Sequence, residues 1–172
     1  HTLGMRLVGY DPYISIEGAW RLPREVEKAE TMEALLQQSD YVSLHVPLVE
    51  ATKNLINTSN LKKFKKDARL INLSRGGIVN TNDVIAELEN GNLGKFVTDF
   101  PTAELIKRSA EKNDVVLLPH LGASTKEAEV NCALMAANQM VNYLQDGTIL
   151  NSVNFPRISL SRGTNHRMVI IN

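Results

Sequence analysis

The sequence is poor in the residues that stabilise secreted or membrane-embedded proteins. It has one cysteine, Cys132, among 172 residues, so no disulfide can form within the chain, and the small apolar neighbours of Cys132 favour a helix. No apolar run approaches the ~20 residues that a membrane-spanning helix needs, and residues 1–5 lack the charged and apolar blocks of a signal peptide. We therefore expect a soluble, cytoplasmic protein.

An excess of either charge is also absent. Lys and Arg total 19 against 19 for Asp and Glu, so no overall field attracts the chain to nucleic acid or to an anionic membrane. The lysines of segment 62–66 precede an apolar run. We expect them to lie at the C-terminal end of a helix, where cations are favourable, and to face water. No residues have the spacing of metal ligands. We expect a small charged metabolite as ligand, and no nucleic acid, membrane or metal.

Short apolar runs alternate with segments of helical spacing. The runs lie at residues 6–10, 41–46, 69–73, 95–98 and 115–118. Between them, Thr31 is placed to cap one helix, and another fits between Thr81 and Gly91. This alternation predicts an α/β fold with a parallel sheet.

The longest helix is predicted downstream of these runs. Ser124 and Glu127 have the spacing of a capping box, and the helical pattern continues to Gly147. Extended chain follows at 152–156, then a polar linker and an apolar run at 168–171. We expect three parts: residues 1–123 in the α/β domain, 124–156 as a linking helix with its tail, and 157–172 as a linker with the first strand of another domain.

The pattern G-x-G-x-x-G, which opens a doubly wound nucleotide-binding domain, is missing from the sequence. The helix N-terminus behind this turn holds the pyrophosphate of a dinucleotide. We therefore expect an incomplete doubly wound sheet, Rossmann-like but without its first βα unit, which lies upstream of His1. Whether such a chain binds a dinucleotide and is active on its own stays open at this point.

Polar side chains follow several of the predicted strands. Asp11 comes after the first run, where its carboxylate could accept hydrogen bonds from a ribose or simply form a turn before Pro12. Arg75 lies on a glycine-flanked turn and offers a planar fork for a carboxylate, although a solvated loop residue is an equal alternative.

Two acids and a histidine follow the last two strands. Asp99 and Glu104 come after one strand, and His120 comes after the next. A histidine with a carboxylate on its far nitrogen suits the reversible oxidation of an alcohol, whereas a lone histidine beside a turn is more often structural. Because parallel strands end at one edge of a sheet, we expect these side chains to converge there with Arg75.

Four segments together resemble the cofactor domain of the D-2-hydroxy acid dehydrogenase family: 9–13 (GYDPY), 44–48 (LHVPL), 71–77 (INLSRGG) and 119–125 (PHLGAST). Within that family, segments 119–125 and 151–156 (NSVNFP) resemble the phosphoglycerate dehydrogenases. The tail at 167–172 resembles the first strand of their ACT regulatory domain.

The resemblance implies NAD as cofactor and a role for each candidate residue. Arg75 binds the substrate carboxylate, His120 exchanges the hydroxyl proton, and Glu104 orients and charges His120. Asp11 takes the adenosine ribose and Asp99 the nicotinamide end. Residues lining the cofactor are Val46, Leu73, Ser74, Arg75, His120, Gly122 and Ala123. Leu105 follows Glu104 where the family often has proline.

The implied reaction is the oxidation of a phosphorylated D-2-hydroxy acid, 3-phosphoglycerate, to 3-phosphohydroxypyruvate in serine biosynthesis. The resemblance also implies a homo-oligomer, and serine as an effector of the regulatory domain. Two alternatives stay open at this point. One is a reductase of glyoxylate or hydroxypyruvate in the same family, and the other is an NAD-sensing protein similar to the family's transcriptional corepressors.

Overall fold

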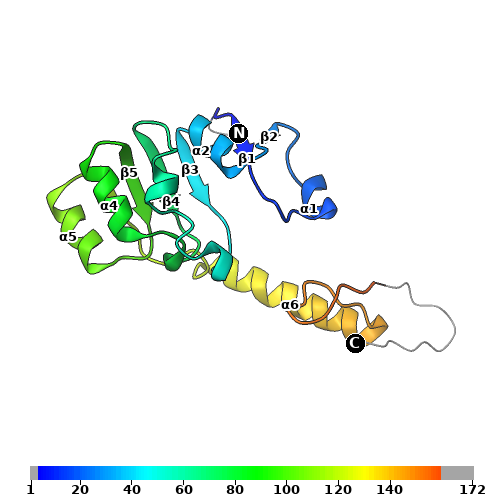
Figure 1. Ribbon diagram of the computed structural model, residues 1–172. Helices are drawn as coiled ribbons and strands as arrows, with labels where there is room; N and C mark the ends of the chain where they lie inside the picture. Colours follow the sequence, from blue (N-terminus) through cyan, green and yellow to red (C-terminus); the bar gives the residue numbers. More distant parts are fainter. Residues whose placement is uncertain (1–3, 160–172) are drawn as a thin grey trace. The chain divides into compact units, whose positions relative to one another are not determined.

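The computed structural model describes residues 4–159 (Figure 1). The chain forms two compact units, the first ending at His120 and the second beginning at Leu121. Among the described residues, no helix is both long and apolar enough to cross a membrane.

The first unit alternates strands with helices, as the apolar runs predict. Its strands are β1 (Leu7–Gly9), β2 (Val26–Lys28), β3 (Tyr41–Leu44), β4 (Ala68–Asn72), β5 (Leu93–Thr98) and β6 (Val115–Leu117). Its α-helices are α1 (Ile16–Trp20), α2 (Met32–Gln38), α3 (Thr58–Leu61), α4 (Thr81–Glu89) and α5 (Ala103–Glu111), with 3-10 turns η1 (Glu50–Thr52) and η2 (Gly76–Ile78). Each of the five predicted runs contains or overlaps an observed strand.

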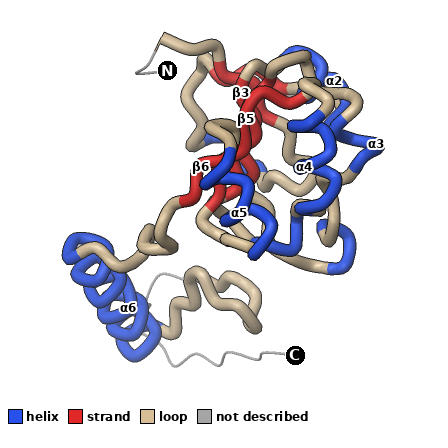
Figure 2. Tube along the Cα trace, turned by 90° about the vertical axis from the view of Figure 1, so that its left-hand side faces the viewer, coloured by secondary structure: helices blue, strands red, loops and turns tan. Residues whose placement is uncertain are grey.

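All strand pairs are parallel, which confirms the predicted fold class. β3, β4, β5 and β6 form a four-stranded sheet in that order, and β1 pairs with β2 in a separate two-stranded sheet. The expected parallel sheet is thus observed as two parallel sheets, one of four strands and one of two. Figure 2 shows strands β3, β5 and β6 of the larger sheet with helices α4 and α5 beside them.

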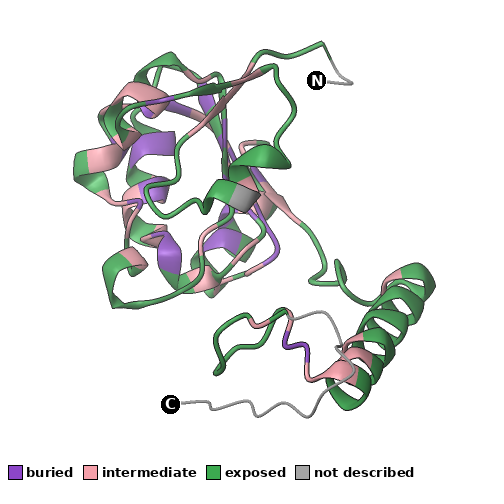
Figure 3. Ribbon diagram, turned by 90° about the vertical axis from the view of Figure 1, so that its right-hand side faces the viewer, coloured by how far each residue is buried: buried purple, intermediate pink, exposed green. Residues whose placement is uncertain are grey.

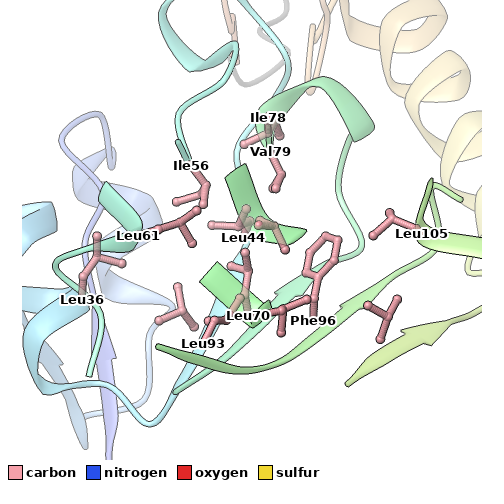
Figure 4. Close-up of a cluster of buried hydrophobic side chains, with 14 residues drawn as sticks. Leu36, Leu44, Ile56, Leu61, Leu70, Ile78, Val79, Leu93, Phe96 and Leu105 are labelled. Carbon is pink, nitrogen blue, oxygen red and sulfur yellow. The ribbon is translucent and has the colours of Figure 1, made fainter. Parts of the chain in front are cut away.

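The larger sheet buries one face against its helices. Buried Val42 and Leu44 alternate with exposed neighbours on β3, and β4 repeats the alternation, so alternate side chains point to one face. This face joins side chains of α2, α3, α4 and α5 in a single apolar cluster around Leu70 and Phe96 (Figure 4). The cluster holds the strand ends in fixed register and so fixes where the following residues lie.

Local capping explains the helix boundaries. The Thr31 hydroxyl accepts a hydrogen bond from the Ala34 backbone N–H at 3.0 Å, as its spacing predicts. Helix α4 begins after Asn80, whose side chain accepts from two backbone N–H groups, and Gly91 follows it with a φ of 70°. Helix α5 is buried through Leu105 and Arg108. The sequence pattern does not predict four of the elements, which have three to nine residues each: β2, α1, α3 and α5.

A buried arginine of helix α5, Arg108, forms ion pairs with two acids from neighbouring segments. The Arg108 guanidinium donates from Nη2 and Nε to the two carboxylate oxygens of Asp114, at 2.7 and 3.1 Å, and from Nη1 to Glu89 at 3.1 Å. The hydrogen bonds to Asp114 raise the pKa of Arg108 above its usual value. This bidentate contact fixes α5 against the loop before β6.

The second unit contains helix α6 (Lys126–Asp146). Its cap is Thr125, whose hydroxyl accepts from the Ala128 N–H at 3.1 Å, so the predicted cap Ser124 is wrong by one residue. The backbone N–H of Ser124 instead donates to the Leu121 carbonyl in the turn before the helix. The helix ends at Gly147 with a φ of 68°, as expected. None of the residues of α6 is buried (Figure 3).

Beyond α6, a single antiparallel bridge joins Ile149 to Ile158. The predicted strand at 168–171, which resembles the start of an ACT domain, lies outside the described residues.

Candidate active site

The register of the larger sheet brings the candidate residues to one edge. Leu44 pairs with Asn72, Asn72 pairs with Thr98, and Thr98 pairs with Leu117. These four residues form one row across the carboxyl ends of β3 to β6. Neighbouring strands lie about 4.8 Å apart, so the segments that follow them leave the sheet side by side.

A buried side chain shapes the turn that carries Arg75. The Asn72 side chain is 1% exposed, and its Nδ2 donates to the Arg75 carbonyl at 2.9 Å. Its Oδ1 accepts from the Ser74 backbone N–H at 3.3 Å and from the Ser74 hydroxyl at 3.1 Å. The Arg75 side chain is exposed and donates from Nη1 to the Ser74 carbonyl at 2.6 Å. The turn therefore has a fixed backbone and presents a guanidinium at the sheet edge.

Phe100 lies between this turn and the histidine. A Cβ added to Gly76 would lie 3.3 Å from the Cβ of Phe100, so the backbone at Gly76 packs directly on that side chain. On its other side, the Phe100 ring meets the His120 ring with centroids 4.9 Å apart, tilted by 54°. One aromatic side chain thus connects the Arg75 turn with His120.

His120 pairs with a buried carboxylate. Its Nδ1 lies 2.8 Å from Oδ2 of Asp99, and the Asp99 side chain is 10% exposed whereas that of His120 is 58% exposed. A carboxylate oxygen beside Nδ1 favours the imidazole tautomer that carries its proton on Nδ1, and that tautomer has a lone pair on Nε2. The other oxygen of Asp99, Oδ1, is buried and has no hydrogen-bond partner within residues 4–159.

The carboxylate on His120 is therefore Asp99 and not Glu104, the residue expected there from the sequence. Glu104 lies in the first turn of α5 and lines a cleft of about 540 Å³ together with Arg108 and residues of α4. A hydrogen bond from its own backbone N–H and one from the Thr102 side chain lower the pKa of Glu104. The side chain of Glu104 therefore has its contacts within its own segment, five residues after Asp99.

The remaining candidates are placed as follows. Asp11 follows β1 and is exposed, and its Oδ1 accepts from the Tyr13 N–H at 2.9 Å, so it forms the turn that the sequence allows. Val46 packs against the core cluster, while Leu73 is 47% exposed beside the Arg75 turn. Gly122 and Ala123 belong to the second unit.

Other polar residues have structural partners. The Ser43 hydroxyl lies 2.9 Å from Nε2 of His45. Lys63 forms an ion pair with Glu33 at 3.0 Å and Lys65 pairs with Asp40, so half of the lysines in segment 62–66 contact acids of α2 and its C-terminal side. Within residues 4–159, no three histidine, cysteine or carboxylate side chains gather in a way that could hold a metal ion.

This fold and edge are those of a dinucleotide-dependent dehydrogenase domain, and comparison with known proteins gives the family. The family model described as "D-isomer specific 2-hydroxyacid dehydrogenase, NAD binding domain" matches residues 1–122. The chain belongs to this family, and the cofactor of the matched domain is NAD.

Individual relatives agree with this placement. The chain is 38% identical over 167 residues to a D-3-phosphoglycerate dehydrogenase of Haemophilus influenzae and 36% identical over 160 residues to one of Synechocystis sp., in both cases over 92% of its own length. It covers 39% and 28% of those two proteins, respectively. The chain therefore spans well under half the length of the curated relatives it matches.

Solved structures share the fold. The holo form of D-mandelate dehydrogenase from Rhodotorula graminis matches with a TM-score of 0.75 at 27% identity, covering 94% of this chain and 47% of that one. The NAD-complexed D-isomer specific 2-hydroxyacid dehydrogenase of Lactobacillus delbrueckii ssp. bulgaricus matches with a TM-score of 0.70 at 25% identity, covering 85% and 47%.

Proposed function

We propose that the complete protein is an NAD-dependent oxidoreductase that converts 3-phospho-D-glycerate to 3-phosphohydroxypyruvate. The observation that carries the proposal is the Asp99–His120 pair at 2.8 Å, on the same sheet edge as the guanidinium of Arg75. An alcohol oxidation needs a base for the hydroxyl proton, and a 2-hydroxy acid needs a cation for its carboxylate. This edge provides both groups.

The residues at the edge fit a nicotinamide cofactor. The buried Oδ1 of Asp99 is an acceptor with no partner among the described residues, and a buried acceptor is stable only when a donor reaches it. The carboxamide N–H of a nicotinamide is such a donor, so Asp99 would hold that end. Asp11 would accept from the ribose hydroxyls, while Val46, Leu73, Ser74, Gly122 and Ala123 would line the cofactor.

Catalysis then divides among three side chains of this chain. Arg75 binds the substrate carboxylate with its planar fork and so fixes the orientation of C2. His120 takes the hydroxyl proton on Nε2 as the alcohol becomes a carbonyl. The carboxylate of Asp99 accepts from Nδ1 and stabilises the imidazolium that results. Bound NAD supplies the acceptor for the hydride that leaves C2.

The orienting role expected of Glu104 passes in this proposal to Asp99. Asp99 directly follows β5 and Glu104 stands five residues later in α5, and of these two acids only Asp99 is within ion-pair distance of the His120 ring in the described part of the chain. Glu104 instead belongs to the first turn of α5, where an acid favours the positive end of the helix dipole.

The substrate is proposed from the relatives, because two of those compared carry the name D-3-phosphoglycerate dehydrogenase. The test is the rate of NADH formation by the complete protein with 3-phospho-D-glycerate, D-lactate and D-glycerate, together with NADH consumption by glyoxylate and hydroxypyruvate. We expect kcat/KM to be highest for 3-phospho-D-glycerate. A preference for glyoxylate or hydroxypyruvate reduction would assign the protein to the other branch of the family.

Assembly and location are part of the same proposal. We propose a cytoplasmic homo-oligomer with serine as an effector, as the resemblance to phosphoglycerate dehydrogenases implies. Sedimentation of the complete protein, with and without serine, tests the homo-oligomer and the effect of serine on it. A monomer in both conditions would contradict the proposed assembly.

A further inference from the structure

Asn72 is the last residue of β4, a strand with neighbours on both sides in the larger sheet. Its side chain is among the largest fully buried ones, and the only other polar side chain in that set is Thr98, its cross-strand partner. Burying an amide costs free energy unless its donors and acceptor find partners. An apolar residue would fill this position at lower cost, so the contacts of Asn72 need an explanation.

The side-chain contacts of Asn72 are with Ser74 and Arg75, two residues of the turn that follows β4. The amide nitrogen donates to the Arg75 carbonyl, and the amide oxygen accepts from the backbone N–H and hydroxyl of Ser74. The first bond fixes the backbone at Arg75, which is extended with φ −150° and ψ 140°. The second pair fixes Ser74, whose carbonyl in turn accepts from the Arg75 guanidinium.

We propose that Asn72 is a positioning residue that sets the direction of the Arg75 side chain for substrate binding. This inference rests on the proposed role of Arg75. The position requires a donor and an acceptor on one short side chain, because a carbonyl and an N–H must be bonded together. Of the common side chains of this length, asparagine provides both, aspartate provides only acceptors when ionised, and leucine provides neither.

The function of such a residue is precision rather than contact. A guanidinium binds a carboxylate through two parallel hydrogen bonds, which tolerate little error in direction. A displacement of about 1 Å at a substrate-positioning group can lower the rate about 100-fold. Asn72 acts through Arg75 and is not itself expected to touch the substrate.

The test uses the complete protein and the variant N72D, which keeps the size and the acceptor but removes the donor to the Arg75 carbonyl. We expect kcat/KM for 3-phospho-D-glycerate to fall about 10- to 100-fold, with most of the change in KM for the acid and little change in the dissociation constant of NAD. N72S, which introduces no buried carboxylate, replaces N72D if that variant does not fold, and a decrease in the same direction is expected.

The distinguishing measurement is made in the R75K background. If Asn72 acts through the guanidinium fork, N72D lowers kcat/KM much less in R75K than in the unaltered protein, because the directed fork is already lost. Equal factors in the two backgrounds would overturn the proposal. A fully active R75K would instead contradict the proposed function itself, so the two failures are distinguishable.

Asn57 provides a matched control. Its side chain also both donates and accepts hydrogen bonds at a turn. Nδ2 donates to the Asn54 carbonyl at 3.0 Å, and Oδ1 accepts from the backbone N–H groups of Ser59 and Asn60. N57D therefore loses the same kind of bond at the start of α3. We expect it to lower the melting temperature but to leave kcat/KM within about twofold. A loss as large as that of N72D would indicate general destabilisation and overturn the specific role.

Discussion

Nδ1 of His120 lies 2.8 Å from Oδ2 of Asp99, and the second oxygen of that carboxylate is buried with no hydrogen-bond partner in the part of the chain that the structure describes. One carboxylate at the end of β5 therefore orients the histidine and retains an acceptor for another donor. The next acid along the chain, Glu104, belongs instead to the first turn of α5. This separation of the two acids yields the first prediction.

Replacing Asp99 is expected to impair catalysis far more than replacing Glu104. D99N keeps the shape but removes the charge that stabilises the imidazolium, so we expect kcat in the complete protein to fall about 100-fold, the lower end of the range for acid–base catalysis. E104Q is the matched control and should leave kcat within about threefold. Steady-state kinetics with 3-phospho-D-glycerate makes the comparison. A large loss in E104Q with an active D99N would restore Glu104 as the partner of His120.

Arg75 is expected to tolerate no cationic substitute. R75K keeps the charge but loses the fork, and charge-assisted hydrogen bonds contribute about 1.5–3 kcal/mol each, so kcat/KM should fall at least tenfold. R69K is the control on the strand that precedes the Arg75 turn, because Arg69 of β4 stacks on Tyr41 with its guanidinium carbon 4.9 Å from the ring centroid, before the sheet edge. Activity of R75K close to that of R69K would remove Arg75 from the substrate site.

Gly76 is expected to be sensitive to a single methyl group. A Cβ there would lie 3.3 Å from the Cβ of Phe100, and the Phe100 ring packs on His120. G76A should therefore displace the Phe100 ring by a few tenths of an ångström, because overpacking at this contact costs about 1–3 kcal/mol. Since the displaced ring packs on His120, we expect kcat to fall about three- to tenfold. Wild-type kcat in G76A would indicate that Phe100 moves without affecting the histidine.

Gly94 is a stability position rather than a catalytic one. A Cβ at Gly94 would lie 2.5 Å from the Asp67 carbonyl oxygen, beside an irregularity in the pairing of β4 with β5. Because the contact is with backbone, relief requires movement of a strand, and we expect G94A to destabilise the first unit by about 1–3 kcal/mol. Thermal unfolding measures this. G122A, where a Cβ meets nothing within 4 Å, is the control, and equal melting temperatures for the two variants would contradict the account.

Much of the fold could be predicted from the sequence because burial leaves a clear pattern. Val115, like the buried residues of β3, β4 and β5, packs into the apolar cluster on one face of the larger sheet, and this burial makes the runs recognisable. The short helix α3 has four residues and no detectable period, and β2 has three, so neither could be recognised. The cap at Thr125 instead of Ser124 shows that adjacent hydroxyl residues compete for one role.

The site was predictable as a location but not as a set of contacts. The order of strands and acids places Arg75, Asp99 and His120 at one edge, since parallel strands end together. Which acid meets the histidine depends on the exact exit of the chain from β5, and this is set by packing around Phe100 that the sequence does not display. Asn72 has no role of its own in the prediction, because it is treated there only as part of segment 71–77. An asparagine at the end of an apolar strand could have indicated a structural role.

The central claim is that His120 removes the hydroxyl proton of a D-2-hydroxy acid while the domain holds NAD. It is tested most directly by comparing H120N with the unaltered complete protein, measuring both NADH formation from 3-phospho-D-glycerate and the dissociation constant of NAD. We predict a loss of kcat of at least about 100-fold with NAD affinity nearly unchanged. Turnover by H120N at the rate of the unaltered protein, with NAD bound equally well, would contradict the account.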